Sequence, residues 1–314
     1  MDTEADDFPE PASGVRPASG VLPASGVRPA IGVDVGATLA KLALREPDGR
    51  LSLFSMPAHA LDDVSVRVNA LSPGSIGLTG CRATGLEPQL DQTPVRLIEF
   101  EAWARGSREL LRAQQIDDTA PYLLVSVGTG TSVLRIEGDA VTRLGGTALG
   151  GGTVMGLGHA LTGCASFEEL CQLARQGRRG EVDLLIGDIY EDGVIALPAA
   201  ATAAAFGNLA RRMLGEAGSM RAGSRVDPSD RADLAAAVMG LVAENVALIS
   251  CGLAATAGVS RVVFGGATLP GNDLLRALLV GVTAALGREP ILLEQGAHAG
   301  AVGALGAVEH SSAA

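Results

Sequence analysis

Two stretches of the sequence share one pattern, and this repeat constrains the fold more than any other feature of the 314-residue chain. Residues Ile31–Leu44 and Tyr122–Leu144 each read as an apolar strand, a turn of glycine and threonine, and a second strand. Apolar runs of this length with glycine-containing turns between them are typical of β-hairpins. Such a duplication is the layout expected of a nucleotide held between two like domains.

Helical segments alternate with strands along the rest of the chain. We predict helices over Leu61–Ala70, from about Glu99 onward, and over Ser229–Ala257, with further helices at Val182–Tyr190 and Ala201–Leu214. Later in the sequence, the order strand, glycine turn and helix occurs twice, beginning at RVVFGG and at PILLE. This order predicts an α/β arrangement with ligand-facing turns at the ends of strands.

The composition is that of a folded protein with a large core, since 47% of the residues are hydrophobic. A formal charge of −11 argues against a general nucleic-acid-binding or anionic membrane surface. Charged residues such as Glu244 and Arg276 interrupt the apolar stretches and no secretory signal precedes the fold, so we expect no membrane span. The four cysteines and four histidines lack metal-ligand spacing, and the cysteines indicate no disulfide framework. Without a signal or a membrane span, we expect a cytoplasmic protein with reduced thiols.

Residues 1–29 are expected to form a disordered tail. After an acidic start they repeat PASGVR, PASGVL and PASGVR, a composition that cannot build a core. We interpret the tail as a tolerated extension of the terminus, with a recruitment arm as the alternative.

The nucleotide-binding motifs with strong local signatures are absent from the sequence. It contains no G-x-x-x-x-G-K-[ST] P-loop and no G-x-G-x-x-G opening a helix in a βαβ unit. No G-x-S-x-G nucleophile elbow stands at a strand end. What remains is a set of glycine-rich turns at Gly36–Thr38, Gly128–Thr131 and Gly265–Pro270.

Three carboxylates stand where they could serve chemistry. Asp34 lies inside an otherwise apolar strand, where a buried carboxylate is costly unless it is paired or serves a metal. A hydrogen-bonded turn aspartate is the alternative. Glu99 and Glu101 stand where a helix begins, so either could act as a general base. Taken alone, their position is explained better by complementarity to the helix dipole.

The stretch Val125–Thr153 combines a glycine/threonine turn, the lone Arg143 and a triple-glycine turn that enters an apolar helix. Small residues let backbone N–H groups approach oxygens, and a helix N-terminus favours negative charge. The stretch therefore suits a phosphate ester beside an anionic substrate. A pair of tight hairpins explains it equally well.

The glycine turns, separated by hairpins and helices, resemble those of the acetate and sugar kinase, heat-shock ATPase and actin superfamily. Within it, the run VTRLGGTALGGGTVMGLGHALTG, followed by FEEL, VDLLIGDIY and FGN, is similar to type II pantothenate kinases, and the similarity covers nearly all of Ile31–Val308. The resemblance implies an α/β, two-domain actin-like ATPase fold of the ribonuclease H-like kind. An interdomain nucleotide cleft would lie between residues 30–120 and residues 121–314. A homodimer is also implied, with the long helix Ser229–Ala257 as the candidate interface.

The resemblance further implies an enzyme that uses ATP and Mg²⁺ to phosphorylate pantothenate, the first step of coenzyme A biosynthesis. Glu99 is the implied general base and Arg143 the residue that holds the pantothenate carboxylate, with Thr129 and Ser132 as further substrate contacts. Asp34 is implied to bind Mg²⁺ through water. The implied ATP-binding residues are Asp34, Gly36, Ala37, Thr38, Lys41, Thr129, Gly151, Gly152, Thr153, Phe167 and Gly266.

The chain departs from the family pattern at Ala37, where a glycine is common, and in an adenosine turn that reads GGAT. With only two tyrosines and one tryptophan, the aromatic lining of the far end of the substrate site is reduced, which leaves acyl-CoA feedback open. Two other functions remain as alternative hypotheses. A sugar or amino sugar kinase of the same superfamily would give Arg143 no carboxylate to meet. A nucleotide-binding regulatory pseudokinase is disfavoured by the presence of both Glu99 and Arg143.

Overall fold

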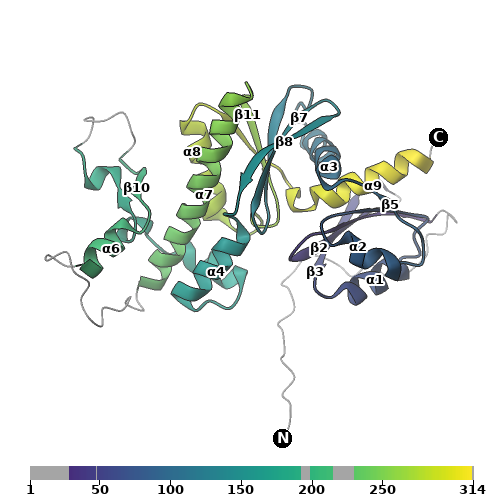
Figure 1. Ribbon diagram of the computed structural model, residues 1–314, viewed down its shortest axis with the longest axis horizontal. Helices are drawn as coiled ribbons and strands as arrows, with labels where there is room; N and C mark the ends of the chain where they lie inside the picture. The colour runs from purple at the N-terminus through teal and green to yellow at the C-terminus, as the bar shows by residue number, and fades with distance from the viewer. Residues whose placement is uncertain (1–27, 47, 192–198, 215–229, 313–314) are drawn as a thin grey trace, which may run out of the picture.

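The computed structural model describes residues 28–46, 48–191, 199–214 and 230–312. Within these residues the chain forms two five-stranded sheets with helices α3 and α9 packed between them, and a smaller two-stranded sheet (Figure 1). Residues 216–228, whose polar sequence predicts a loop, and all but the end of the predicted tail lie outside the described residues.

The N-terminal half begins with three antiparallel strands, as the hairpin pattern predicts. They are β1 (Ala30–Val35), β2 (Leu39–Arg45) and β3 (Leu51–Pro57). Helix α1 (Leu61–Ala70) has the predicted bounds, and β4 (Ser75–Thr79) then pairs with β1 in parallel. This half is completed by α2 (Ala83–Leu86), a 3-10 turn (Glu87–Gln89), β5 (Val95–Arg96) and α3 (Glu99–Ala113). The sheet order is β3-β2-β1-β4-β5.

The second half repeats this topology. It contains the antiparallel strands β6 (Tyr122–Val127), β7 (Thr131–Glu137) and β8 (Ala140–Thr147), then α4 (Gly151–Thr162), α5 (Phe167–Ala174) and the long α7 (Arg231–Thr256). It ends with β11 (Arg261–Gly265), α8 (Asp273–Ala285), β12 (Glu289–Leu292), a 3-10 turn (Gly296–His298) and α9 (Ala299–Ser312). The sheet order is β12-β11-β6-β7-β8, so the central strands β1 and β6 have equivalent neighbours in equivalent directions. The predicted duplication is confirmed in the topology.

Helices α3 and α9 meet backbone to backbone in the layer between the sheets. A Cβ added at Gly106 or at Gly303 would lie 2.7 Å from a carbonyl carbon of the facing helix, so neither position accepts a side chain without movement. Apolar residues of both helices share one buried cluster with residues of the second sheet, among them Leu111, Val302 and Leu124. Helix α9 also lies on β1 and β4 of the first sheet. It thus connects the two predicted subdomains, and the boundary between them at residue 120 stays a prediction.

The prediction of a helix at Val182–Tyr190 is wrong. The segment contains the strand β9 (Leu184–Leu185) and a 3-10 turn (Ile186–Asp188), and β9 pairs with β10 (Thr202–Ala204). The predicted helix Ala201–Leu214 is correct only for α6 (Gly207–Leu214). Strand pairing between two short segments depends on a tertiary contact, which the periodicity of either segment alone does not encode.

Helix α7 is long and apolar enough to cross a membrane by length and composition alone. Inside the protein, however, 72% of the most apolar 18-residue segment of α7 is buried, and the helix packs against α4, α5 and α8. Mostly buried core helices of soluble proteins pass the same test. Two of its large apolar side chains stay on the surface, since Leu248 is 51% exposed and Ile249 is 36% exposed.

Candidate active site

A cleft of about 690 Å³ is lined by residues from both halves, which suits a small ligand because such sites measure roughly 300–1,000 Å³. Its walls come from the turns after β1, β6 and β11 and from the first turns of α3, α4 and α9. Ligand-facing turns at strand ends are what the α/β pattern predicts. The predicted site residues in the lining are Asp34, Gly36, Ala37, Thr38, Lys41, Glu99, Thr129, Ser132, Gly151, Gly152, Phe167 and Gly266.

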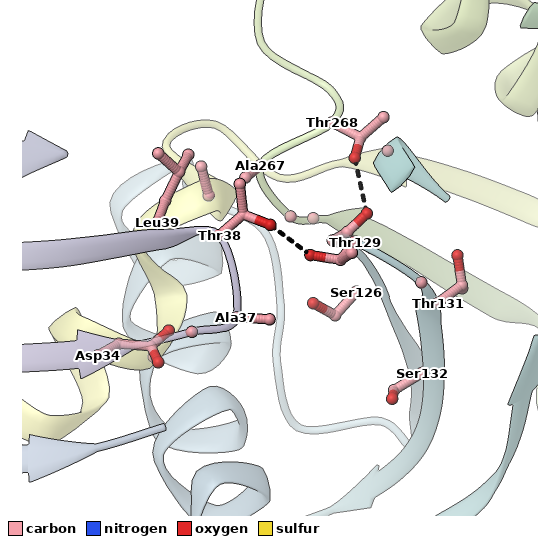
Figure 2. Close-up of a pocket in the computed structure, with 18 of the residues that line it drawn as sticks. Asp34, Ala37, Thr38, Leu39, Ser126, Thr129, Thr131, Ser132, Ala267 and Thr268 are labelled. Carbon is pink, nitrogen blue, oxygen red and sulfur yellow. Dashed lines mark hydrogen bonds between the residues drawn. The ribbon is translucent and has the colours of Figure 1, made fainter. Parts of the chain in front are cut away.

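The turns after β1 and β6 face each other across the cleft. The side-chain hydroxyls of Thr38 and Thr129 are hydrogen bonded at 2.9 Å (Figure 2). Among the described residues, the backbone N–H groups of Ala37, Thr38, Thr129 and Gly130 have no hydrogen-bond partner. Unpaired N–H groups in such turns form concave sites for anions. The two turns can therefore hold phosphate oxygens between them.

The triple-glycine turn at the start of α4 is bonded to the β6–β7 turn. The N–H of Gly151 donates to the Gly128 carbonyl at 2.7 Å, and the N–H of Gly152 donates to the Thr129 carbonyl at 2.9 Å. These two N–H groups are engaged within the protein, while the glycine carbons line the cleft. Thr153 is not among the lining residues, and its hydroxyl donates to the Ala148 carbonyl at 3.2 Å. Its contact with ATP stays a prediction.

The turn after β11 approaches β6 so closely that Gly266 cannot carry a side chain. Its φ is +109°, and a Cβ there would lie 2.6 Å from the carbonyl carbon of Val127. Beside it, the Thr268 hydroxyl donates to the Gly128 carbonyl at 2.9 Å (Figure 2). The third glycine turn is thereby fixed to the second.

Asp34 lies near the end of β1 and is only 3% exposed. Burial raises the pKa of its carboxyl, whereas the charge of Lys41, opposite it on β2, and hydrogen bonding by Trp103 lower it. Its Oδ1 has no hydrogen-bond partner among the described residues, which is costly for a buried carboxylate.

Asp34 fits a role in binding Mg²⁺. This ion is usually held by one or two carboxylates together with water and substrate phosphates. The described part of the chain has no group of three or more His, Cys, Asp or Glu side chains that could hold a metal ion without such help. The unpaired Oδ1 of Asp34, beside two turns suited to phosphate, matches this mode of binding.

Glu99 opens α3 and lines the cleft. Burial raises the pKa of its carboxyl, the negative charge of Asp34 raises it further, and Lys41 lowers it. A raised pKa suits a general base, which acts best when its pKa is near the working pH. Glu101 is exposed and outside the cleft lining, so of the two carboxylates only Glu99 lines the cleft, and its role as general base stays a prediction.

Arg143 lies on β8 beside the cleft, although it is not among the lining residues. A Cβ added at Gly146 would lie 3.3 Å from its Nη2 atom. Gly146 is the register partner of Ser132 on β7, and Ser132 lines the cleft. The guanidinium of Arg143 therefore lies next to Gly146, which is paired with a residue of the cleft lining, Ser132.

Sequence reasoning does not single out Trp103, Cys81 or Thr268, all of which line the cleft. Trp103 follows Glu99 by one helical turn on α3, and residues at this i, i+4 spacing share a face. That spacing is the signal that could have identified it. Cys81 lies two residues after the end of β4 and carries no comparable local signal.

Solved structures share the fold. Component A of (R)-2-hydroxyglutaryl-CoA dehydratase from Acidaminococcus fermentans is similar with a TM-score of 0.57 at 17% identity, over 91% of this chain and 99% of that one. The ROK family glucokinase from Streptomyces griseus, in complex with glucose and AMPPNP, has a TM-score of 0.52 at 17% identity, over 89% and 98% of the two chains.

Sequence comparison is more specific. The Fumble family model matches residues 79–308. Type II pantothenate kinase from Oceanobacillus iheyensis is 35% identical over 276 residues, which are 87% of this chain and 97% of the relative. The enzyme of that name from Staphylococcus saprophyticus is 33% identical over 276 residues, 87% and 98% of the two chains. The repeated topology and the two similar structures define the class as an actin-like α/β fold with a cleft lined by both halves. Within that class, the chain belongs to the type II pantothenate kinase family.

Proposed function

We propose that this chain transfers the γ-phosphoryl group of ATP to the primary hydroxyl of pantothenate, giving 4'-phosphopantothenate for coenzyme A biosynthesis. The observation that carries the proposal is one cleft lined both by Glu99 and by two turns whose unpaired N–H groups suit phosphate. Relatives 33% and 35% identical over 87% of the chain are named Type II pantothenate kinase.

Glu99 is the general base in this mechanism. Its carboxylate takes the proton of the hydroxyl as that oxygen attacks the γ-phosphorus, the bond from phosphorus to the β,γ-bridging oxygen breaks, and ADP leaves. The raised pKa of the Glu99 carboxyl increases its basicity toward the hydroxyl proton.

Backbone N–H groups and a lysine of the cleft can stabilise the negative charge that develops on the phosphates during transfer. The unpaired N–H groups of Ala37, Thr38, Thr129 and Gly130 and the ammonium of Lys41 are suited to the phosphate oxygens. Asp34 would hold Mg²⁺, through water, and the bound ion would neutralise part of the phosphate charge.

Arg143 is assigned to the carboxylate of pantothenate. Its planar, permanently charged guanidinium can donate two parallel hydrogen bonds to a carboxylate. Ser132, on the neighbouring strand and in the cleft lining, is assigned to the polar backbone of the same substrate, as is Thr129. A neutral sugar would leave Arg143 without a partner, which favours pantothenate as the acceptor.

A panel of acceptors tests the proposal. ADP release is measured by a coupled assay with pantothenate, pantetheine, glucose and N-acetylglucosamine, and the product is identified by mass spectrometry. We expect ADP release that depends on pantothenate and a product heavier by one phosphoryl group. If only a sugar is phosphorylated, the acceptor is that sugar and not pantothenate. ATP binding without turnover of any acceptor would indicate a pseudokinase.

We further propose an oligomeric state and a cellular location for the protein. A homodimer formed through α7 is supported by the exposed apolar side chains of Leu248 and Ile249 on that helix. Light scattering of the wild type and of Leu248→Asp tests it, since the charge should shift the mass toward that of a monomer. A cytoplasmic location is supported by the cysteines, which are all free within the described residues.

A further inference from the structure

Trp103 is the sole tryptophan of the chain, and it stands beside the buried carboxylate of Asp34. The two side chains meet over the first turn of α9. A Cβ added at Gly300 would lie 2.7 Å from the indole Nε1 and 2.8 Å from the Asp34 Cγ, which locates both groups above the same backbone atom. The indole N–H and the carboxylate are therefore neighbours, and the indole lowers the pKa of the Asp34 carboxyl that burial raises.

The position of Trp103 is set by backbone packing. It lies on α3, whose contact with α9 is fixed by the absence of side chains at Gly106 and Gly303. Phe100, on the same helix, packs against the indole edge to face, with 6.0 Å between the ring centroids and an interplanar angle of 61°. The indole therefore approaches Asp34 from a rigid support.

An indole N–H is well suited to orient a metal-binding carboxylate. It donates one hydrogen bond and has no lone pair with which to compete for a cation. Two further charged groups lie close to Asp34: Lys41, which acts on it through charge, and Glu99, whose pKa the charge of Asp34 raises. The Oδ1 atom of Asp34 has no partner among the described residues, so nothing else in that part of the chain holds it.

We infer that Trp103 is a positioning residue: its indole N–H orients the Asp34 carboxylate for Mg²⁺-bound nucleotide and ties it to the helix that carries Glu99. The inference rests on the proposed use of Mg²⁺ and ATP. It does not depend on which acceptor is phosphorylated. Trp103 touches no reacting atom in this role, and acts through Asp34.

Two substitutions of Trp103 distinguish the contribution of the indole N–H from that of the aromatic ring. Trp103→Phe keeps an aromatic ring and removes the N–H. Trp103→Gln removes the ring and keeps an N–H donor the same number of bonds from the Cα. If the donor is what matters, Gln should perform better than Phe in Mg²⁺-dependent steps. If Trp103 only fills space against Phe100, the order should be reversed.

The readout is ADP binding by calorimetry, with Mg²⁺ and with EDTA. In the wild type, Mg²⁺ should tighten binding. In Trp103→Phe, we expect the Mg²⁺-dependent gain to fall about tenfold, the lower end for loss of a hydrogen bond to a charged group, with binding in EDTA unchanged. Trp103→Gln should recover part of the gain.

An unchanged Mg²⁺-dependent gain in Trp103→Phe, or a larger loss in Gln than in Phe, would overturn the inference. Because these arms use ADP alone, they remain informative whatever acceptor is used. A wild type whose ADP binding does not respond to Mg²⁺ would instead count against the proposed function itself. Thermal unfolding of each variant shows whether it is folded before binding is compared.

Discussion

The side-chain hydroxyls of Thr38 and Thr129 are hydrogen bonded at 2.9 Å, although 91 positions separate the two residues in the sequence. Thr38 belongs to the turn after β1 and Thr129 to the turn after β6, the equivalent strand of the second half. Each half therefore supplies the same element to the same point of the cleft. Phosphates bound there would contact both halves at once.

This contact should couple the two halves energetically. We expect Thr38→Val and Thr129→Val each to lower the free energy of unfolding, and the double variant to lose less than the sum. The expected coupling is about 0.5–1 kcal/mol, the contribution of one neutral hydrogen bond at an exposed site. Urea unfolding of the four proteins without nucleotide measures it. If the two effects on the free energy of unfolding simply add, the hydrogen bond between the two hydroxyls contributes nothing to the contact between the turns.

Glu99→Gln should lower kcat by at least about a hundredfold while ADP binding is retained, because general-base catalysis is lost and the side-chain shape is kept. In the wild type, activity should fall as the pH drops through the pKa of Glu99, since the protonated acid cannot accept a proton. Burial raises that pKa above its ordinary value of 4.5, so the loss should begin at a higher pH than an exposed glutamate would give. A pH profile of kcat/KM measures it, and an acid limb that persists unchanged in the variant would assign the limb to another group.

Arg143→Ala should raise KM for pantothenate roughly tenfold or more with little change in kcat, as expected when a charged hydrogen bond to bound substrate is lost. Arg143→Lys should be intermediate, because an ammonium cannot make the paired contact of a guanidinium. The analogue in which the carboxylate is replaced by an alcohol provides the matched control. Its KM should be insensitive to the Arg143 substitutions, and equal sensitivity of both substrates would remove the carboxylate from the assignment.

His298 should make the protein less stable in acid. It precedes α9, its Nε2 lies 3.1 Å from the Ser55 hydroxyl, and burial, with a smaller effect of Lys41, lowers its pKa from 6.5 to about 4. The unfolded chain binds the proton more readily, so the stabilising contribution of the neutral imidazole is complete above pH 6.5 and is lost as the pH falls through about 4. The loss should amount to roughly 2–3 kcal/mol.

The variant His298→Phe isolates this effect from the titration of other groups. Its free energy of unfolding should change less between pH 7 and pH 4 than that of the wild type, by roughly the same 2–3 kcal/mol. Chemical denaturation of both proteins across this range measures the difference. Parallel pH dependences would show that His298 is not the titrating group.

The elements that sequence reasoning predicts well are those whose signals are local. The bounds of α1, Leu61–Ala70, agree with the prediction because a compact apolar pattern is closed on both sides by turn residues. The strands around Gly36 and Gly128 are recognised for the same reason, since strand and turn are adjacent in the sequence. Strands β9 and β10 are missed because each is stabilised by the other.

The candidate site divides in the same way. Asp34 is recognisable from sequence because a carboxylate inside an apolar strand is unusual. The role inferred for Trp103 is not, because its distance from Asp34 depends on how closely α3 and α9 approach at Gly106 and Gly303. The engagement of the Gly151 and Gly152 N–H groups likewise depends on where the β6–β7 turn lies.

Helix α9 covers β1 and β4, so the first sheet to leave the ribosome lacks its covering helix until nearly all of the described chain has been synthesised. Contacts between such distant segments slow folding and leave apolar surface exposed in the meantime. A nascent chain that stops before α9 would carry Asp34 and the turn after β1 without the helix that stabilises them. The earliest part of the cleft to be translated is therefore among the last to acquire its final structure.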